Sequence, residues 1–294
     1  MKRAFDKKRL EEFNAYKQLY YQEPREDFLA IDQADVHDPQ AVAEFASECL
    51  LHMQKTESRF TPSYNCLQSQ RDLTPKMRQI LLGWLVEVHL KFKLLPETLF
   101  LTANIIDRFT QFRQVKRSDY QLLGVTAMLI AAKYEEIYAP EIGDFIYMTD
   151  KAYNKEQMLA MESEILKTLD FNMTVPSCYR FLERFVKLSQ SDDLIENFAR
   201  YIIELSLFET SMYKWKQSHI ASSAIYVARK VLKRQHPWSA FMTEQTGFDE
   251  RAVRACSKEL CLILANAGKS AELKSVEKKF SLPRFMEVSK ICAA

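Results

Sequence analysis

The segment TPKMRQILLGWLVEVHLKF, residues 74–92, decides the fold class of this chain. Thr74 is a good helix N-cap and Pro75 fits a first helical turn, so we expect a helix from about residue 75 to residue 92. Apolar side chains stand on nearly every face of this helix. Such a pattern is typical of a helix at the centre of a bundle, because a surface helix keeps one polar face.

Similar helix starts, a proline or a capping residue ahead of an apolar helical pattern, recur after this segment. They predict four more helices at residues 96–112, 118–135, 141–148 and 154–169. After a break at residues 171–176, five further helices are predicted at residues 177–188, 191–208, 216–234, 237–246 and 249–266. Capping boxes are expected from the spacing of Ser118 with Gln121 and of Asn154 with Gln157, and Ser191 is an expected N-cap. The predicted fold is all-α, with two five-helix domains in tandem.

The regions that flank these two domains have weaker patterns. From Asp38 and Pro39 onward, apolar residues recur at helical spacing as far as Met53, which predicts an additional N-terminal helix, and a polar link follows from Thr56 to Asp72. The expected organisation is an N-terminal extension, a helix with its linker, two domains, and a C-terminal helix with a tail. Their predicted ranges are 1–38, 39–72, 73–171, 172–268 and 269–294.

The composition favours a folded intracellular protein that binds other proteins. Of the 294 residues 47% are hydrophobic, and only 5 are Gly and 9 are Pro, which favours helices around buried cores. Lys and Arg (41) nearly balance Asp and Glu (39), so there is no net field for a nucleic-acid backbone or an anionic membrane. The six cysteines show no CxxC pairing, which indicates reduced thiols. We expect neither nucleic acid nor membrane as a partner.

The sequence contains no motif with the spacing of a catalytic or metal site. The five histidines have no ligand spacing such as HExxH, and no serine elbow occurs. Gly268-Lys269-Ser270 resembles the end of a phosphate-binding loop, but no glycine stands five residues before Gly268. The prediction is a protein that is not an enzyme and needs no cofactor or metal.

Two charged residues do not fit a plain helical core. Glu162 lies on the apolar face marked by Met158 and Ile165, where a carboxylate is costly unless it has a partner. Spacing alone leaves open whether Glu162 reaches water or Lys167 at the edge of this face, or meets another group. Lys133 ends an apolar helix, where a cation suits the helix dipole, but the two glutamates after it do not. An external ionic partner would explain this cluster.

The first two helices of the first domain carry two further features. Arg78 and Asp107 are predicted to form a structural ion pair between these helices, which would specify their packing. The first helix also has an apolar stripe, and the default interpretation of such a stripe is buried core rather than an exposed groove. The stripe consists of Met77, Ile80, Leu81 and Trp84.

The sequence resembles the cyclin box of A- and B-type cyclins in motifs that occur in the expected order. They are MRxILxxWLVEV at residues 77–88, IDRF at 106–109, AAKYEEIY at 131–138 and ME at 161–162. The resemblance continues through YIxELSL at residues 201–207 and covers roughly residues 38–290. PEIGDF at residues 140–145 is most like the B-type group, and the choice between A- and B-type stays open at this point.

This resemblance implies a tandem pair of five-helix cyclin folds that binds and activates a cyclin-dependent kinase. The chain would be a non-catalytic subunit of a heterodimer, active around G2/M in the nucleus and cytoplasm. Lys133 and Glu162 match the ion-pairing residues that hold the mobile helix of the kinase. The positions that line this contact are matched by Tyr134, Glu136, Ile137 and Phe171.

The resemblance also implies a surface patch that docks Arg-x-Leu motifs of substrates or inhibitors, in place of the buried-core interpretation of the stripe. Its matching residues are Met77, Ile80, Leu81, Trp84 and Gln121. Glu87 would offer a charge-assisted hydrogen bond to the arginine of the motif. Gly83 stands where many relatives have an acidic residue, so weaker docking of cationic motifs is expected.

The same fold allows an alternative function. A cyclin-fold adaptor would bind transcription machinery or peptides rather than a cell-cycle kinase. Such a protein is expected to present a basic face, which a net charge of +2 disfavours.

Overall fold

The computed structural model describes residues 29–39 and 41–292. The chain divides into two compact units between His52 and Met53. The first unit contains α2 (Ala30–Gln33), the 3-10 turn η1 (Ala43–Phe45) and the beginning of α3 (Ala46–Phe60). The end of α3 and all later elements belong to the second unit. Residues 1–28 of the expected N-terminal extension lie outside the described residues.

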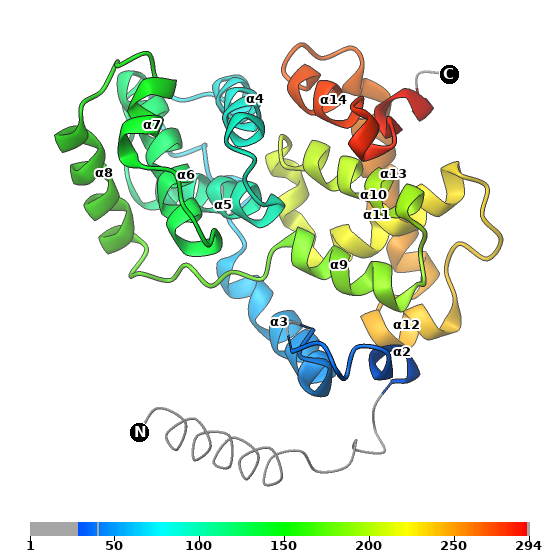
Figure 1. Ribbon diagram of the computed structural model, residues 1–294. Helices are drawn as coiled ribbons and strands as arrows, with labels where there is room; N and C mark the ends of the chain where they lie inside the picture. Colours follow the sequence, from blue (N-terminus) through cyan, green and yellow to red (C-terminus); the bar gives the residue numbers. More distant parts are fainter. Residues whose placement is uncertain (1–28, 40, 293–294) are drawn as a thin grey trace, which may run out of the picture. The chain divides into compact units, whose positions relative to one another are not determined.

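The second unit contains two helical bundles in tandem (Figure 1). The first bundle consists of α4 (Pro75–Phe92), α5 (Pro96–Phe112), α6 (Tyr120–Glu135), α7 (Ile142–Met148) and α8 (Lys155–Thr168). Helix α6 packs against all four of the others, and it is buried without interruption from Leu122 to Ala132. Its small residues allow this close approach, since a Cβ atom at Gly124 would lie 2.8 Å from Cδ1 of Leu81 in α4.

The second bundle repeats this plan around α11. It consists of α9 (Cys178–Leu188), α10 (Asp193–Ser206), α11 (Gln217–Val231), α12 (Ala240–Thr246) and α13 (Glu250–Ala267). Helix α11 packs against α9, α10 and α13, and it is buried without interruption from Ser218 to Ala228. No strand occurs within the described ranges, so the prediction of two tandem five-helix domains is confirmed.

The ten helices of the two bundles begin and end within three residues of their predicted bounds. Thr74 caps α4 as expected, because its side chain accepts a hydrogen bond from the backbone N–H of Met77 at 3.3 Å. The predicted capping box of Asn154 and Gln157 is present at the start of α8, with both of its hydrogen bonds at 2.9 Å. Local capping chemistry was therefore a sound guide to these helix starts.

Two predicted caps are wrong. The 3-10 turn η2 (Arg117–Asp119) precedes α6, so the Ser118 hydroxyl donates to the carboxylate of Asp119 at 2.9 Å and forms no capping box with Gln121. At α10 the cap is Asp192 rather than Ser191, because a carboxylate at that position accepts from the N–H of Ile195 at 2.9 Å.

The polar link that was predicted to begin at Thr56 is also wrong, since α3 continues to Phe60. A tertiary contact holds its last turns. The carboxylate of Glu57, which is 1% exposed, accepts hydrogen bonds from the backbone N–H and the hydroxyl of Ser218 at 2.9 and 2.8 Å. It thereby caps the N-terminus of α11 from outside that helix, where a negative charge is favourable.

A further helix, α14 (Lys274–Phe280), packs against α4 of the first bundle and α10 of the second (Figure 1). The ammonium of Lys279 donates to both carboxylate oxygens of Glu204 in α10, at 2.6 and 2.8 Å, and both side chains are almost fully buried. Burial and then the charge of Lys279 lower the pKa of His89 in α4 to about 3, so this histidine is neutral. Helix α14 is therefore part of the core that joins the two bundles.

Candidate functional site

The first candidate site, the Lys133 surface, lies at the C-terminal end of α6 and consists of Lys133, Tyr134, Ile137, Glu162 and Phe171. The ammonium of Lys133 donates to both carboxylate oxygens of Glu162 in α8, at 2.7 and 2.9 Å. The Lys133 side chain is 49% exposed and that of Glu162 is 14% exposed. The partner of Glu162 is therefore Lys133 within the chain, and neither Lys167 nor an external group is needed to explain it.

Exposed apolar side chains follow the ion-paired residues along the chain, at the end of α6 and after α8. Ile137 is 89% exposed, Phe171 is 67% exposed and Tyr134 is 47% exposed. The Tyr134 hydroxyl forms a hydrogen bond with Thr174, which links the end of α6 to the segment that follows Phe171. Tyr138, next to Ile137 in the sequence, is 91% exposed, although no role was predicted for it. Exposed apolar side chains in such a group indicate a surface that binds another protein.

The backbone after α8 displays the Phe171 ring. Asp170 and Phe171 have φ angles of +51° and +55°, in the left-handed region that bulky residues rarely adopt. The backbone N–H of Phe171 donates to the carbonyl oxygen of Leu166 at 2.9 Å, which ends α8 in a tight turn. Such backbone strain is a common feature of functional sites.

Glu136, which was expected to line the same contact, is engaged inside the first bundle. Its carboxylate accepts hydrogen bonds from the backbone N–H of Leu95 at 2.7 Å and from the hydroxyl of Thr98 at 2.5 Å. These groups lie at the N-terminus of α5, so Glu136 stabilises the start of that helix. Its neighbour Glu135 points elsewhere, and burial, then the negative charge of Glu97, raise the pKa of its carboxyl group.

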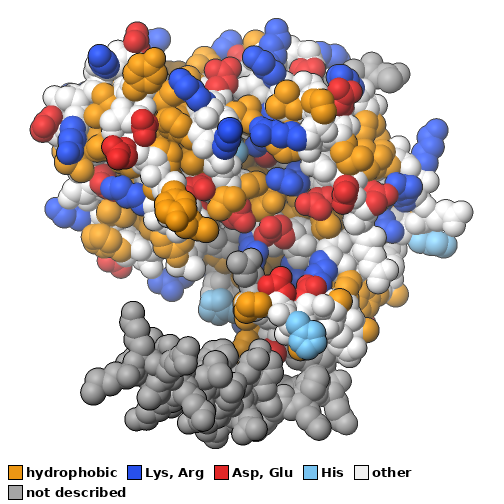
Figure 2. All heavy atoms as spheres, viewed as in Figure 1, with side chains coloured by type: hydrophobic (Ala, Val, Ile, Leu, Met, Phe, Trp, Pro, Cys, Tyr) orange, Lys and Arg blue, Asp and Glu red, His pale blue; other side chains and the backbone are white. Residues whose placement is uncertain are grey.

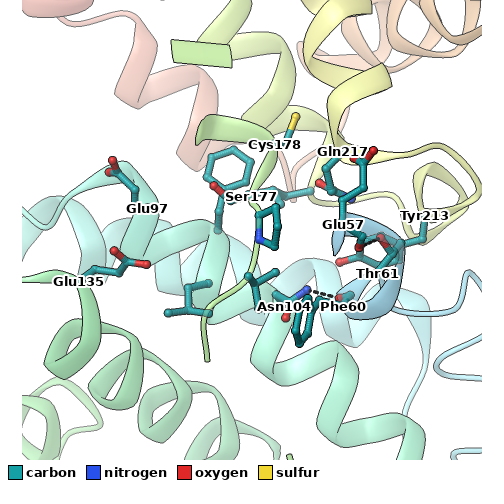
Figure 3. A pocket seen from close by; sticks show the side chains of 15 residues that line it. Glu57, Phe60, Thr61, Glu97, Asn104, Glu135, Ser177, Cys178, Tyr213 and Gln217 are labelled. Atoms are coloured by element: carbon teal, nitrogen blue, oxygen red, sulfur yellow. Dashed lines mark hydrogen bonds between the residues drawn. The ribbon is translucent and has the colours of Figure 1, made fainter. Parts of the chain in front are cut away.

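Glu97 and Glu135 lie at one end of a narrow cavity between the bundles (Figure 3). The cavity measures about 30 Å³, which is room for little more than one water molecule. A hydrogen bond of 2.8 Å from the Asn104 amide to the carbonyl oxygen of Phe60 closes part of it. We regard this cavity as a packing feature of the junction and not as a ligand site.

The Arg78–Asp107 pair lies in the core between α4 and α5. The guanidinium of Arg78 donates to both carboxylate oxygens of Asp107 at 2.7 Å, and both side chains are 1% exposed. Tyr213, in the 3-10 helix η3 (Thr210–Lys214) of the second bundle, donates its hydroxyl to the same carboxylate. No local sequence signal could have found Tyr213, because it lies 106 residues away from Asp107.

The second candidate site is the α4 groove, about 280 Å³ in volume. One wall comes from α4, and the other comes from the start of α14 and the residues before it. Its lining residues are Ile80, Gly83, Trp84 and Glu87 on α4, and Ala271, Glu272, Lys274 and Ser275 opposite.

The structure divides the apolar stripe of α4 between this groove and the core. Ile80 is 55% exposed, so the buried-core interpretation is wrong for it, whereas Leu81 is 7% exposed and its side chain lies against Gly124 of α6. Trp84 is half-buried in the wall. Met77 and Gln121 are also half-buried, but neither lines the groove.

The described residues give no sign of a membrane span or a metal centre. No helix among residues 29–39 and 41–292 is long and apolar enough to cross a bilayer. In the same part of the chain no three His, Cys, Asp or Glu side chains gather as metal ligands would. Acidic and basic side chains are mixed over the visible face of the second unit, with hydrophobic side chains between them (Figure 2).

Both halves of the chain match known domain families. The family "Cyclin, N-terminal domain" matches residues 48–174, and "Cyclin, C-terminal domain" matches residues 176–294. The chain therefore belongs to the cyclin family. Within this family it is similar to B-type mitotic cyclins, as the following relatives indicate.

One such relative is "G2/mitotic-specific cyclin-B" of Marthasterias glacialis, which is 39% identical over 284 residues, covering 97% of this chain and 73% of the relative. "Cyclin-B1-3" of Arabidopsis thaliana is 42% identical, covering 86% of this chain and 61% of the relative. "G2/mitotic-specific cyclin-B" of Patella vulgata is 40% identical, covering 89% and 63%. The chain thus spans 61 to 73% of the length of these relatives.

Solved structures share the fold at much lower identity. A viral cyclin from herpesvirus saimiri superposes with a TM-score of 0.64 at 17% identity, covering 73% of this chain and 97% of the viral chain. A chain of the yeast RNA Pol II CTD kinase CTDK-1 complex gives a TM-score of 0.59 at 14% identity, covering 77% of this chain and 81% of that chain. These likenesses concern the fold alone.

Proposed function

We propose that this chain is a regulatory subunit that binds and activates a cyclin-dependent protein kinase and recruits its substrates around G2/M. Family membership supports the activity, and relatives named G2/mitotic-specific cyclin-B support the timing. In this proposal the phosphoryl transfer, the ATP and the metal ions belong to the kinase. The chain contributes binding energy and no catalytic group.

The Lys133 surface is the observation that carries this proposal. Ile137 and Phe171 are largely exposed, and fully burying an apolar side chain of this size contributes roughly 1.5–3 kcal/mol. The ammonium of Lys133 has three donors, and Glu162 accepts from it at two oxygens. A donor therefore remains for a carbonyl oxygen of a partner. Because the ion pair already fixes both side chains, little rotamer freedom is lost when a partner binds.

Activation by such a subunit requires only differential binding. Protein kinases are active when a glutamate on a mobile helix pairs with the catalytic lysine. A subunit that binds the active position of that helix more tightly than the inactive one shifts the equilibrium toward the active state. The preformed, exposed pair of Lys133 and Glu162 would act in this way by holding the helix in its active position.

A reconstituted kinase assay tests this role. The double variant Lys133→Ala with Glu162→Ala should need ~30-fold more protein to activate the kinase, because a central charged contact of an interface is lost. Its melting temperature should stay close to wild type, since an exposed ion pair contributes at most about 1 kcal/mol to stability.

A matched control is the exposed pair of Glu250 and Arg254 on α13, which is joined at 2.8 Å. Replacing both of these residues by alanine should leave kinase activation unchanged. Retained activation by the Lys133 and Glu162 double variant, at wild-type concentrations, would contradict the proposal.

Substrate recruitment is tested separately. Met77→Ala with Trp84→Ala should leave activity on a short peptide substrate unchanged and lower activity on substrates that carry an Arg-x-Leu motif, because only the latter use α4 for docking. Equal losses on both substrates would instead indicate that these two residues support the core.

A further inference from the structure

The far wall of the α4 groove comes from the other end of the chain. Ala271, Glu272, Lys274 and Ser275 face α4 across the groove. The Lys279–Glu204 pair anchors α14 to α10, and Val276 and Phe280 are fully buried behind it. The wall is therefore held rigidly before any ligand arrives, which lowers the entropy lost on binding.

Gly83 allows this wall to stand close to α4. A Cβ atom at position 83 would lie 3.1 Å from the backbone carbonyl oxygen of Glu272 and 3.5 Å from the hydroxyl oxygen of Ser275. A contact of 3.1 Å is tighter than side chains normally tolerate, so a larger residue would push the wall outward. The missing side chain at position 83 thus brings Glu272 to the edge of the groove.

The groove combines an apolar floor with carboxylates on both sides. Ile80 and Trp84 offer exposed apolar surface on α4, and Glu87 stands exposed one turn after Gly83. Glu272 lies on the opposite wall, where the Ser270 hydroxyl donates to its carboxylate at 2.8 Å. That hydrogen bond is the main reason why the pKa of Glu272 is lowered, and the carboxylate is ionised at neutral pH.

Two contacts in the groove are incomplete. The ammonium of Lys76 lies 3.6 Å from the carboxylate of Glu272, but the Lys76 side chain is 74% exposed, so this ion pair is weak. Ser275 lines the groove and is 9% exposed as a residue, but its hydroxyl oxygen is buried and has no hydrogen-bond partner among the described residues. Buried hydroxyls normally have a partner, so this wall of the groove contains an unsatisfied polar group.

We propose that Glu272 is a specificity-determining residue of the α4 groove: with Glu87 it binds a basic side chain of a docking peptide whose apolar side chain lies on Ile80 and Trp84. Lys76 occupies the position of that basic side chain in the free protein and competes with it. This inference rests on the proposed docking function of α4. In this proposal the carboxylate of Glu272 on the opposite wall takes the place of the acidic side chain that is missing at Gly83.

Competition by Lys76 predicts effects of opposite sign on the same peptide. Binding is measured by fluorescence polarisation on the full chain in complex with its kinase, with a labelled peptide that contains Arg-Ala-Leu. Glu272→Gln should weaken binding about threefold to tenfold, because a charge-assisted contact is lost. Lys76→Ala should tighten binding about twofold to fourfold, and the double variant should bind like Glu272→Gln.

A matched peptide with Ala-Ala-Leu and two distant variants control for indirect effects. Neither Glu272→Gln nor Lys76→Ala should change binding of the Ala-Ala-Leu peptide by more than about twofold, since it lacks the basic side chain. Glu244→Gln on α12 and Lys278→Ala on α14 remove exposed charges away from the groove and should change neither peptide.

Three results would overturn the inference: unchanged affinity of Glu272→Gln for the Arg-Ala-Leu peptide, equal losses for both peptides, or no binding of either peptide to the wild-type chain. Kinase activation on a short peptide without a docking motif is measured in parallel. Full activation there, together with either of the first two results, would leave the proposed kinase-activating function standing and reject only the role of Glu272. Full activation without binding of either peptide would reject docking on α4 as well and still leave kinase activation standing.

Discussion

Replacing Lys279 by methionine should detach α14 from α10. Lys279 and Glu204 are 2% and 3% exposed and are joined at 2.6 and 2.8 Å, so the variant leaves a carboxylate in the core without a counter-charge. Breaking a buried pair in this way costs about 3–5 kcal/mol. That is a large share of the ~5–15 kcal/mol that stabilise a typical folded protein.

Two signals would separate release of α14 from global unfolding. Trp84 lines the groove against Ala271 and Glu272, so its fluorescence should change when α14 leaves α4, whereas circular dichroism in urea follows all helices together. In both signals the midpoint of unfolding should lie at a lower urea concentration for Lys279→Met than for the wild type. In the variant, the change in fluorescence should occur at a lower urea concentration than the change in circular dichroism.

The controls use a neighbour and the partner of Lys279. Lys278→Met changes an exposed lysine in the same helix and should be neutral. Glu204→Met combined with Lys279→Leu should recover most of the lost stability, because an apolar pair of similar volume replaces the ion pair at little cost. A Lys279→Met variant within about 1 kcal/mol of wild type, or a double variant no better than the single one, would refute this reasoning.

Two further predictions concern residues that place the helices. Burial raises the pKa of Glu57 above its ordinary value, so the stability due to its protonated form is present at low pH and is lost as the pH rises through the folded-state pKa. When the pH is lowered from 7 to 5, the free energy of unfolding of the wild type should therefore rise relative to that of Glu57→Gln in urea unfolding. The same difference in free energy at both pH values would contradict this. In the same assay Gly124→Ala should lower the free energy of unfolding by about 1–3 kcal/mol, because the new Cβ atom would lie 2.8 Å from the Leu81 side chain. Gly143→Ala should raise it by about 0.5–1 kcal/mol, because the space around Gly143 is open and alanine favours a helix. Equal stability of the two glycine variants would refute the packing argument.

The sequence was a reliable guide wherever neighbouring residues decide the outcome. Helix starts at Thr74 and Asn154 were predictable because the capping atoms lie within three residues of their donors. The prediction failed at Ser118, where a 3-10 turn shifts the helix start, and at Thr56, where α3 continues because Glu57 contacts a distant helix. Local rules contain no information about such contacts.

The sequence supplied candidate residues for both sites but not their contacts. The resemblance to cyclins named Lys133 and Glu162, yet only the structure shows that they pair with each other and that Glu136 caps α5. Glu272 was missed altogether, because it lies in a segment expected to be a C-terminal helix and tail. One signal was present: Gly83 interrupts an otherwise bulky helix, and such a glycine can mark the close approach of another backbone.

The contact of Tyr213 with the Arg78–Asp107 pair has a consequence for the order of folding during synthesis. Both charged residues belong to the part of the chain that leaves the ribosome first, whereas the tyrosine emerges more than a hundred residues later. Until then the Arg78–Asp107 pair of a newly made first bundle is partly hydrated, because Tyr213 does not yet cover it. A fragment that ends before residue 213 should therefore have a less stable first bundle than the whole chain has. The nascent whole chain should depend on chaperones until its second bundle has been made.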